Sequence, residues 1–150
     1  MTRVCLVGDE DVELRYELVS RETARDALAT HDLETPYTNT LALETVSLGA
    51  AVALLNDLDW YLARFAREAF VLDHSVSDGE WLSRDLATAI RDDELDHADS
   101  GRFLKVFGVD DGRLREPMFV TRTGTELPAY DLHDVDGTLI VRVTESEFGA

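Results

Sequence analysis

The sequence predicts an α+β fold in one domain, with a mixed or antiparallel sheet of about five strands packed against a long central helix and two further helices. Three observations predict it. An apolar run from Leu48 to Leu72 has the length of a central helix. Residues 103–144 show period-two patterning broken by turn signals. The chain of 150 residues has the size of a single domain. The expected order of elements is β-α-β-α-α-β-β-β.

The central helix is expected to be buried. The residues from Leu48 to Leu55 are almost all apolar, so a helix formed by them must be surrounded by protein on every side. Polar and charged side chains between Asn56 and Glu68 are too frequent for a membrane-spanning segment. We therefore expect no association with a membrane.

The N-terminal third predicts a strand, a helix and a second strand. The short apolar run from Arg3 to Val7 is typical of a strand and ends at Gly8, after which an amphipathic pattern predicts one helix from Val12 to Leu28. Residues 31–40 have the composition of a turn. Residues 41–46 alternate as a strand does, and Ser47 is placed to cap the central helix.

A capping box predicts the start of the third helix. Ser77 is followed three residues later by Glu80, and Val76 could pack on Trp81 as a hydrophobic staple. The apolar stripe that follows extends to Ile90. We therefore expect a helix from Ser77 to the acidic residues that begin after Arg91.

The C-terminal third predicts three strands. Residues 103–109 and 113–122 flank an Asp-Gly turn and so predict a hairpin. Pro117 cannot donate a ladder hydrogen bond, so its strand should lie at an edge or carry a bulge. A long loop is expected over residues 123–135. The most apolar strand, residues 138–144, should lie inside the sheet.

The charge composition indicates a salt-rich cytoplasm. There are 31 acidic and 14 basic residues, for a net charge of −17, and Lys105 is the only lysine. Such a surface is typical of halophilic proteins. Residues 1–20 contain acids and lack the apolar centre of a signal peptide, so a cytoplasmic location is expected. In molar salt the electrostatic screening length falls to about 3 Å. The net charge therefore does not by itself exclude acidic partners.

Several segments also resemble a family of small acidic haloarchaeal proteins that has no assigned role. The resemblance is carried by TRVCLVGDEDVELRYELVSRETA at the start, by ETVSLGAAVALLNDLDWYL and EWLSRDLA in the middle, and by VRVTESEFGA at the end. It covers most of the chain. It implies an archaeal, halophilic protein and supplies no activity.

The first candidate site is one face of the expected central helix. Asn56, Trp60, Arg64 and Arg67 are spaced four, four and three residues apart, which places them together on that face. A tryptophan beside two arginines is typical of a binding hot spot and could also stack on a base or hold an anion. The alternative is that Trp60 packs under another element while the arginines pair with nearby acids.

The second candidate site is the acidic cluster Asp9, Glu10 and Asp11 that follows the first strand. Carboxylates gathered there could bind Mg²⁺, the one cofactor that the sequence suggests. The alternative is that Asp9 or Asp11 caps the following helix. The same acids would repel phosphate, and GDED is not a nucleotide-binding loop.

Three functions fit these observations. The first is a non-catalytic adaptor that binds a protein partner or a second copy of itself through the Trp60 face. The second binds RNA or a small anion, and would need Arg64 and Arg67 to be joined by Arg142 or Arg122 in a concave surface. The third is a metal-dependent enzyme using Asp9 and Asp11. No catalytic residue is assigned, because the serines lack a GxSxG elbow and Cys5 has no evident activating partner.

Overall fold

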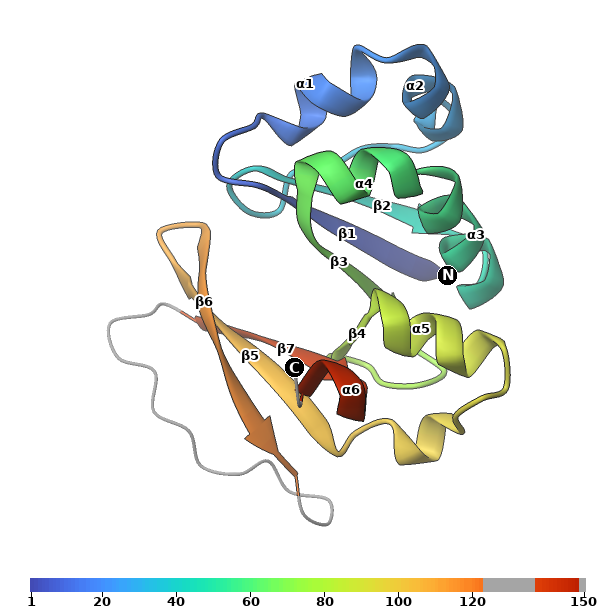
Figure 1. Cartoon of the computed structure of the whole chain (residues 1–150), viewed down its shortest axis with the longest axis vertical. Helices are drawn as coiled ribbons and strands as arrows, with labels where there is room; N and C mark the ends of the chain where they lie inside the picture. The colour runs from blue at the N-terminus through green and yellow to red at the C-terminus, as the bar shows by residue number, and fades with distance from the viewer. Residues whose placement is uncertain (123–136, 149–150) are drawn as a thin grey trace.

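The computed structural model describes residues 1–122 and 137–148. These residues form seven strands, six α-helices and one 3-10 helix (Figure 1). In chain order they are β1 (Thr2–Gly8), α1 (Leu14–Val19), α2 (Glu22–Leu28), β2 (Thr40–Thr45), α3 (Leu48–Asp57), α4 (Asp59–Phe65), β3 (Ala66–Asp73), β4 (Trp81–Ser83), α5 (Arg84–Arg91), η1 (His97–Asp99), β5 (Phe103–Asp110), β6 (Arg113–Thr121), β7 (Gly137–Val143) and α6 (Glu145–Phe148).

All seven strands belong to one mixed sheet with the order β2-β1-β3-β4-β7-β5-β6. The neighbours β4 and β7 are parallel, and the other neighbouring strands are antiparallel. The prediction of a five-stranded sheet packed against a long central helix is therefore wrong. The helices are short, and within the described ranges none is both long and apolar enough to cross a membrane.

The apolar run that predicted the central helix forms two helices and a strand. Helix α3 ends at Asp57, and Leu58 between the helices has φ −93° and ψ 1°, outside the regular helix. Leu58 is fully buried, so its side chain packs in the core where the chain changes direction. Helix α4 then ends at Phe65, and Ala66 is already extended.

Strand β3 shows why the prediction failed. Its sequence, AREAFVLD, is rich in Ala, Arg and Glu, which favour helix. In the fold it pairs with the whole length of β1, from Thr2 opposite Asp73 to Gly8 opposite Ala66. This pairing of two central strands outweighs the local preference for helix.

Two other helix predictions are also corrected. The single helix expected from Val12 to Leu28 is broken at Ser20 and Arg21 into α1 and α2. The third helix starts at Arg84 with Ser83 as its N-cap, and Trp81 lies in the short strand β4. The Ser77 hydroxyl does accept a hydrogen bond from the Glu80 amide at 3.1 Å, but no helix follows it.

Most of the strand predictions are confirmed. Strands β1, β2, β5 and β6 form where the patterns placed them, and Ser47 accepts a hydrogen bond from the Ala50 amide at the start of α3. The hairpin turn uses Asp111 and Gly112 with φ of 52° and 76°. Strand β6 is an edge strand with Pro117 in it, and β7 lies inside the sheet. The loop expected over residues 123–135 lies outside the described residues.

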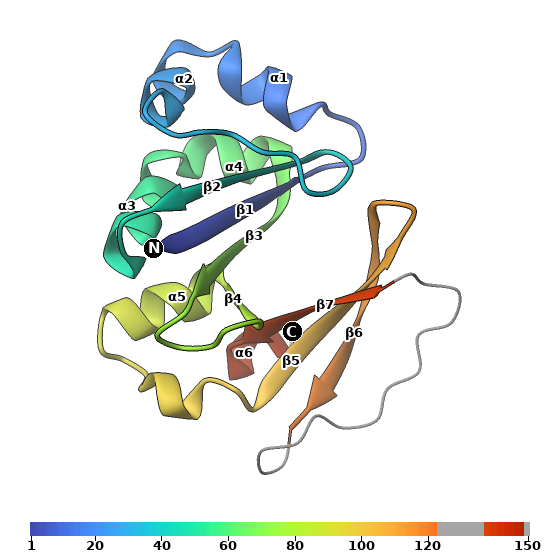
Figure 2. The same cartoon turned by 180° about the vertical axis from the view of Figure 1, so that it is seen from behind.

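One face of the sheet packs against the helices. Figure 1 shows α1 to α4 gathered over the β2-β1-β3 part of the sheet, with α5 beside β4, and Figure 2 shows the same arrangement from behind. Val4 and Leu6 of β1 and Leu41 and Leu43 of β2 face this layer and are buried. Leu55 of α3 is fully buried against them.

The other face of the sheet curls onto itself. Strands β3 and β5 are three places apart, which would separate them by about 14 Å in a flat sheet. The rings of Phe70 and Phe107 on these strands nevertheless have centroids 5.4 Å apart. Lys105 Nζ lies 2.6 Å from Glu68 Oε1 on the same face. The sheet therefore bends strongly at β4 and encloses a second core.

Candidate functional site

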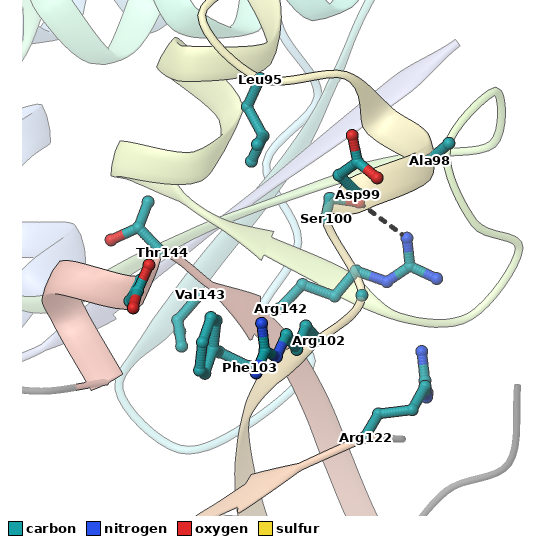
Figure 3. Close-up of a pocket in the computed structure, with 12 residues that line it drawn as sticks. Leu95, Ala98, Asp99, Ser100, Arg102, Phe103, Arg122, Arg142, Val143 and Thr144 are labelled. Atoms are coloured by element: carbon teal, nitrogen blue, oxygen red, sulfur yellow. Dashed lines mark hydrogen bonds between the residues drawn. The ribbon is translucent and has the colours of Figure 1, made fainter. Parts of the chain in front are cut away.

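A large cavity lies where β5 begins and β7 ends. It has a volume of about 1050 Å³, and its wall includes Arg102, Arg122 and Arg142 (Figure 3). The carboxylates of the wall are Asp99 and Glu145. In a chain with a net charge of −17, three guanidinium groups around one cavity are a local concentration of positive charge. We call this cavity the arginine pocket.

Three different segments bring the arginines together. Arg142 lies on the face of β7 opposite Val141 and Val143, which are buried in the second core. Arg122 directly follows β6, and its amide donates a hydrogen bond to the carbonyl of Arg102 at 2.7 Å. Because Arg102 directly precedes β5, the pairing of β5 with β6 and β7 fixes the relative positions of all three residues.

Glu80 holds two of the three guanidinium groups. Arg122 donates to both oxygens of its carboxylate, and Arg142 Nε donates to Oε1 at 2.8 Å. Burial alone would raise the pKa of Glu80, but the hydrogen bonds and charges of Arg122 and Arg142 outweigh it and hold that pKa below its usual value. One carboxylate therefore orients two cations and neutralises the charge of only one.

Backbone and hydroxyl groups complete the support of the arginines. Arg142 Nη1 donates to Oγ of the buried Ser100 at 3.0 Å, and that hydroxyl donates to the carbonyl of His97 at 2.6 Å. Gly101 lies close to both guanidinium groups. A Cβ there would come within 2.9 Å of Arg122 Nη1 and 3.4 Å of Arg142 Cζ.

One polar atom of the pocket lacks a partner. Arg122 Nε is buried, and in the described part of the protein it has no hydrogen-bond acceptor. A buried donor without an acceptor costs about 1–3 kcal/mol of stability. Because the atom has almost no accessible surface, an acceptor reaches it only when the Arg122 side chain shifts.

Part of the pocket wall is apolar. Figure 3 shows Leu95, Val143 and Phe103 on the side of the cavity away from Arg122. The Phe103 ring packs on Phe148, with centroids 5.0 Å apart, and the guanidinium of Arg102 lies 5.2 Å from the Phe103 centroid. The pocket therefore offers both charged donors and apolar surface.

The residues of the first predicted site lie elsewhere and are not all on one helix. Trp60 is 50% exposed on α4, and Arg64 stacks on its ring with Cζ 3.7 Å from the centroid. Arg64 Nη1 also donates to the Trp60 carbonyl at 2.9 Å. Asn56, at the end of α3, accepts a hydrogen bond from Arg84. Arg67 is in β3, so the four residues do not share a helix face.

The predicted acidic cluster does not cap α1. The cap contact comes from Asn39, whose Oδ1 accepts a hydrogen bond from the Leu14 amide at 2.9 Å, and α1 has no capping side chain at its own N-cap residue. Asp9 is half-buried, and Glu10 and Asp11 are exposed. Within residues 1–122 and 137–148, no three acidic, histidine or cysteine side chains are grouped as ligands for a metal ion. The magnesium alternative remains a prediction.

Local sequence patterns do not predict the arginine pocket. Glu80 and Arg142 are 62 residues apart in the sequence, and the only local signal, Glu80 three residues after Ser77, indicated a cap. The sequence suggests Arg122 and Arg142 only as additions to Arg64 and Arg67. The structure brings Arg122 and Arg142 together without either of the other two.

Residues 2–109 match a family model described as a family of unknown function, DUF5804. The chain belongs to this family. The expected membership of a family without an assigned role is thereby confirmed, whereas the haloarchaeal source remains a prediction. The matched region includes Glu80 and residues 100–103 of the arginine pocket and ends before Arg122 and Arg142. No curated protein and no solved structure matches the chain.

Proposed function

We propose that the protein binds a small organic anion, with its charged group on Arg142, Arg122 and Arg102 and its apolar body on Phe103, Val143 and Leu95. The observation that carries this proposal is the sharing of Glu80 by two guanidinium groups at the wall of a large cavity. Arginine side chains held in place by a carboxylate are preorganised donors for a phosphate or carboxylate group.

The volume and chemistry of the pocket favour a small molecule over a nucleic acid strand. Ligand cavities commonly have volumes of about 300–1,000 Å³ and combine apolar walls with a few placed polar groups. The arginine pocket has this volume and this mixture of walls. Asp99 and Glu145 in its wall would repel, at short range, the neighbouring phosphates of a long polyanion.

Calorimetric titration with phenyl phosphate tests the proposal, because this probe combines a dianion with an aromatic body. We expect saturable binding that Arg142→Gln weakens at least about tenfold, the loss of one charge-assisted pair. Arg25→Gln is the matched control, since Arg25 is an exposed arginine that does not line the pocket. Equal binding by the wild-type protein and a folded Arg142→Gln variant would rule out this site.

A second candidate function is a protein contact through Trp60. Its support is the half-exposed indole, which forms a group of rings with Tyr61 and Phe65 on the surface of α4. Exposed tryptophans beside arginines are frequent in binding hot spots. The test compares the wild type with Trp60→Ala in folding, in oligomeric state and in the proteins that co-purify. If all three are unchanged, the protein contact through Trp60 is ruled out.

We also propose that the protein acts in a cytoplasm rich in salt. The support is the net charge of −17 together with a single lysine, Lys105, which is itself half-buried and paired with Glu68. The exposed charged surface therefore consists of Asp, Glu and Arg. High salt screens long-range attraction between the arginines and an anion. The arginine pocket would therefore recognise its ligand mainly through short-range hydrogen bonds from the positioned guanidinium groups.

A further inference from the structure

A second cavity lies at the other end of β5, beside the turn of the β5–β6 hairpin. Its volume is about 750 Å³, and its wall includes Arg15 of α1, Arg67 of β3 and Arg113 of β6. We call it the hairpin pocket. Because β5 has eight residues, its two ends are roughly 24 Å apart, at about 3.4 Å per residue. The two pockets lie at these opposite ends and share no lining residue.

The three arginines of the hairpin pocket differ from those of the arginine pocket. Within the described residues, the guanidinium groups of Arg15, Arg67 and Arg113 form no ion pair and no side-chain hydrogen bond. Other arginines form ion pairs with carboxylates, for example Arg3 with Glu34 and Arg84 with Asp59. In a chain with 31 acidic residues, three unpaired guanidinium groups around one cavity form an available site for an anion.

Hydrogen bonds between separate segments hold the walls of this pocket together. Asn39 Nδ2 donates to the carbonyls of Asp9 and Val12, at 2.9 and 2.8 Å, and ties the loop after β1 to the loop before β2. The Thr38 amide donates to the Gly112 carbonyl at 2.7 Å and ties that second loop to the hairpin turn. The pocket is therefore built across three parts of the chain.

Gly8 allows this close arrangement at the base of the pocket. A Cβ at Gly8 would lie 2.6 Å from Asn39 Nδ2 and 2.8 Å from Leu14 Cβ. Asn39 itself has φ 55°, a left-handed conformation that asparagine adopts more readily than most residues. Gly8, Leu14 and Asn39 therefore pack closely where the pocket meets β1.

The other groups of the wall indicate what the body of the ligand is. Thr35 and Thr38 bring exposed hydroxyl groups, and Glu10 and Glu13 bring carboxylates that accept hydrogen bonds from hydroxyl groups. The three guanidinium groups of the wall outnumber these two carboxylates, so one phosphate meets a net positive charge although Glu10 by itself would repel it. The further phosphates of a polyanion such as RNA would meet Glu10 and Glu13 without such compensation. We propose that the hairpin pocket binds the phosphate monoester of a hydroxyl-bearing small molecule, with the phosphate on Arg15, Arg67 and Arg113.

Calorimetric titration of the full chain with glycerol 3-phosphate tests this proposal, with glycerol as the uncharged control. We expect saturable binding of the phosphate and none of glycerol. Arg67→Gln and Arg113→Gln should each weaken binding at least about tenfold, which is the loss of one charge-assisted pair. These residues are exposed, so the variants should fold, and circular dichroism verifies it.

Two further variants distinguish binding in the hairpin pocket from binding in the arginine pocket and from nonspecific attraction to surface arginines. Arg142→Gln removes an arginine of the arginine pocket and should not reproduce the loss of glycerol 3-phosphate binding that Arg67→Gln causes, so the outcome for this pocket is separate from the outcome for the proposed function. Arg25→Gln removes an exposed arginine outside both pockets and should have no effect. The proposal is overturned if no saturable binding occurs, or if Arg25→Gln weakens it as much as Arg67→Gln does.

Discussion

Arg142 Nε donates a hydrogen bond to Glu80 Oε1 over 2.8 Å, although the two residues are 62 positions apart in the sequence. Their side chains are only 14% and 17% exposed. The pair therefore connects the segment before β4 to β7 inside the protein. Because Arg122 shares the same carboxylate, loss of Glu80 would leave two partly buried cations without a counter-ion.

We expect Glu80→Gln to lower the free energy of unfolding by about 3 kcal/mol at about pH 7, the usual cost of breaking a buried ion pair. Urea denaturation measures this loss. Glu94→Gln is the matched control, because Glu94 is exposed on the surface beyond α5. A loss no larger than that of the control would show that the shared carboxylate does not stabilise the fold.

The effect of Glu80 should depend on pH in a defined direction. Its folded-state pKa is lowered, so the stability that it contributes is present above the unfolded pKa of about 4.3 and is lost as the pH falls through the folded value. The difference in unfolding free energy between wild type and Glu80→Gln should therefore shrink below about pH 4.3. A difference that stays constant on acidification would contradict a lowered pKa.

Gly101→Ala should weaken ligand binding more than it weakens the fold. The new Cβ would come within 2.9 Å of Arg122 Nη1, so the end of that side chain must move away from the position set by Glu80. Titration with phenyl phosphate and thermal denaturation together measure both effects. Gly79→Ala is the control, because a Cβ there meets nothing within 4 Å. Equal binding by the two variants would show that the position of Arg122 is unimportant.

The pair of Lys105 and Glu68 should contribute more to stability than a surface pair does. Both side chains are about one fifth exposed, and Lys105 lies over the rings of Phe107 and Phe119. A double-mutant cycle with Lys105→Met and Glu68→Gln should give a coupling free energy above about 1 kcal/mol. The exposed pair of Arg3 and Glu34 should give less than about 0.5 kcal/mol. Equal couplings would show that the curled sheet gives Lys105 no special environment.

The net charge of −17 predicts that salt stabilises the protein. Repulsion among the carboxylates of the folded surface is screened as the ionic strength rises. The midpoint of thermal unfolding should therefore be higher in about 2 M KCl than in about 0.1 M KCl. A midpoint that falls or stays constant would contradict the halophilic interpretation.

The strands were predictable where the side-chain pattern was local. Strands β1 and β2 and the hairpin of β5 and β6 follow from alternation and from an Asp-Gly turn that needs positive φ. Pro117, which cannot donate a ladder hydrogen bond, predicted that its strand lies at an edge or carries a bulge. Strand β6 is at the edge of the sheet, and its register with β5 shifts between Phe107 and Val109. These features depend on a few neighbouring residues, so one sequence is sufficient to find them.

The helix break at Leu58 and the strand β3 were not predictable in this way. The residues of β3 favour a helix when considered alone, and only pairing with β1 makes them a strand. The arginine pocket was missed for a related reason. Its wall comes from residues 95–103, from Arg122 after β6 and from residues 142–145, while Glu80 lies before β4. Only the folded sheet brings these segments together.

Anion binding in the arginine pocket is tested most directly by NMR, by following the signal of the Arg122 Nε–H group during titration with phenyl phosphate. This donor is buried and lacks an acceptor within the described structure, so an anion in the arginine pocket should move its signal together with that of Arg142 Nε–H. We predict saturable shifts of these two signals, with the Arg25 signal unchanged. Unchanged signals of Arg122 and Arg142 at saturating phenyl phosphate would contradict the proposed anion site.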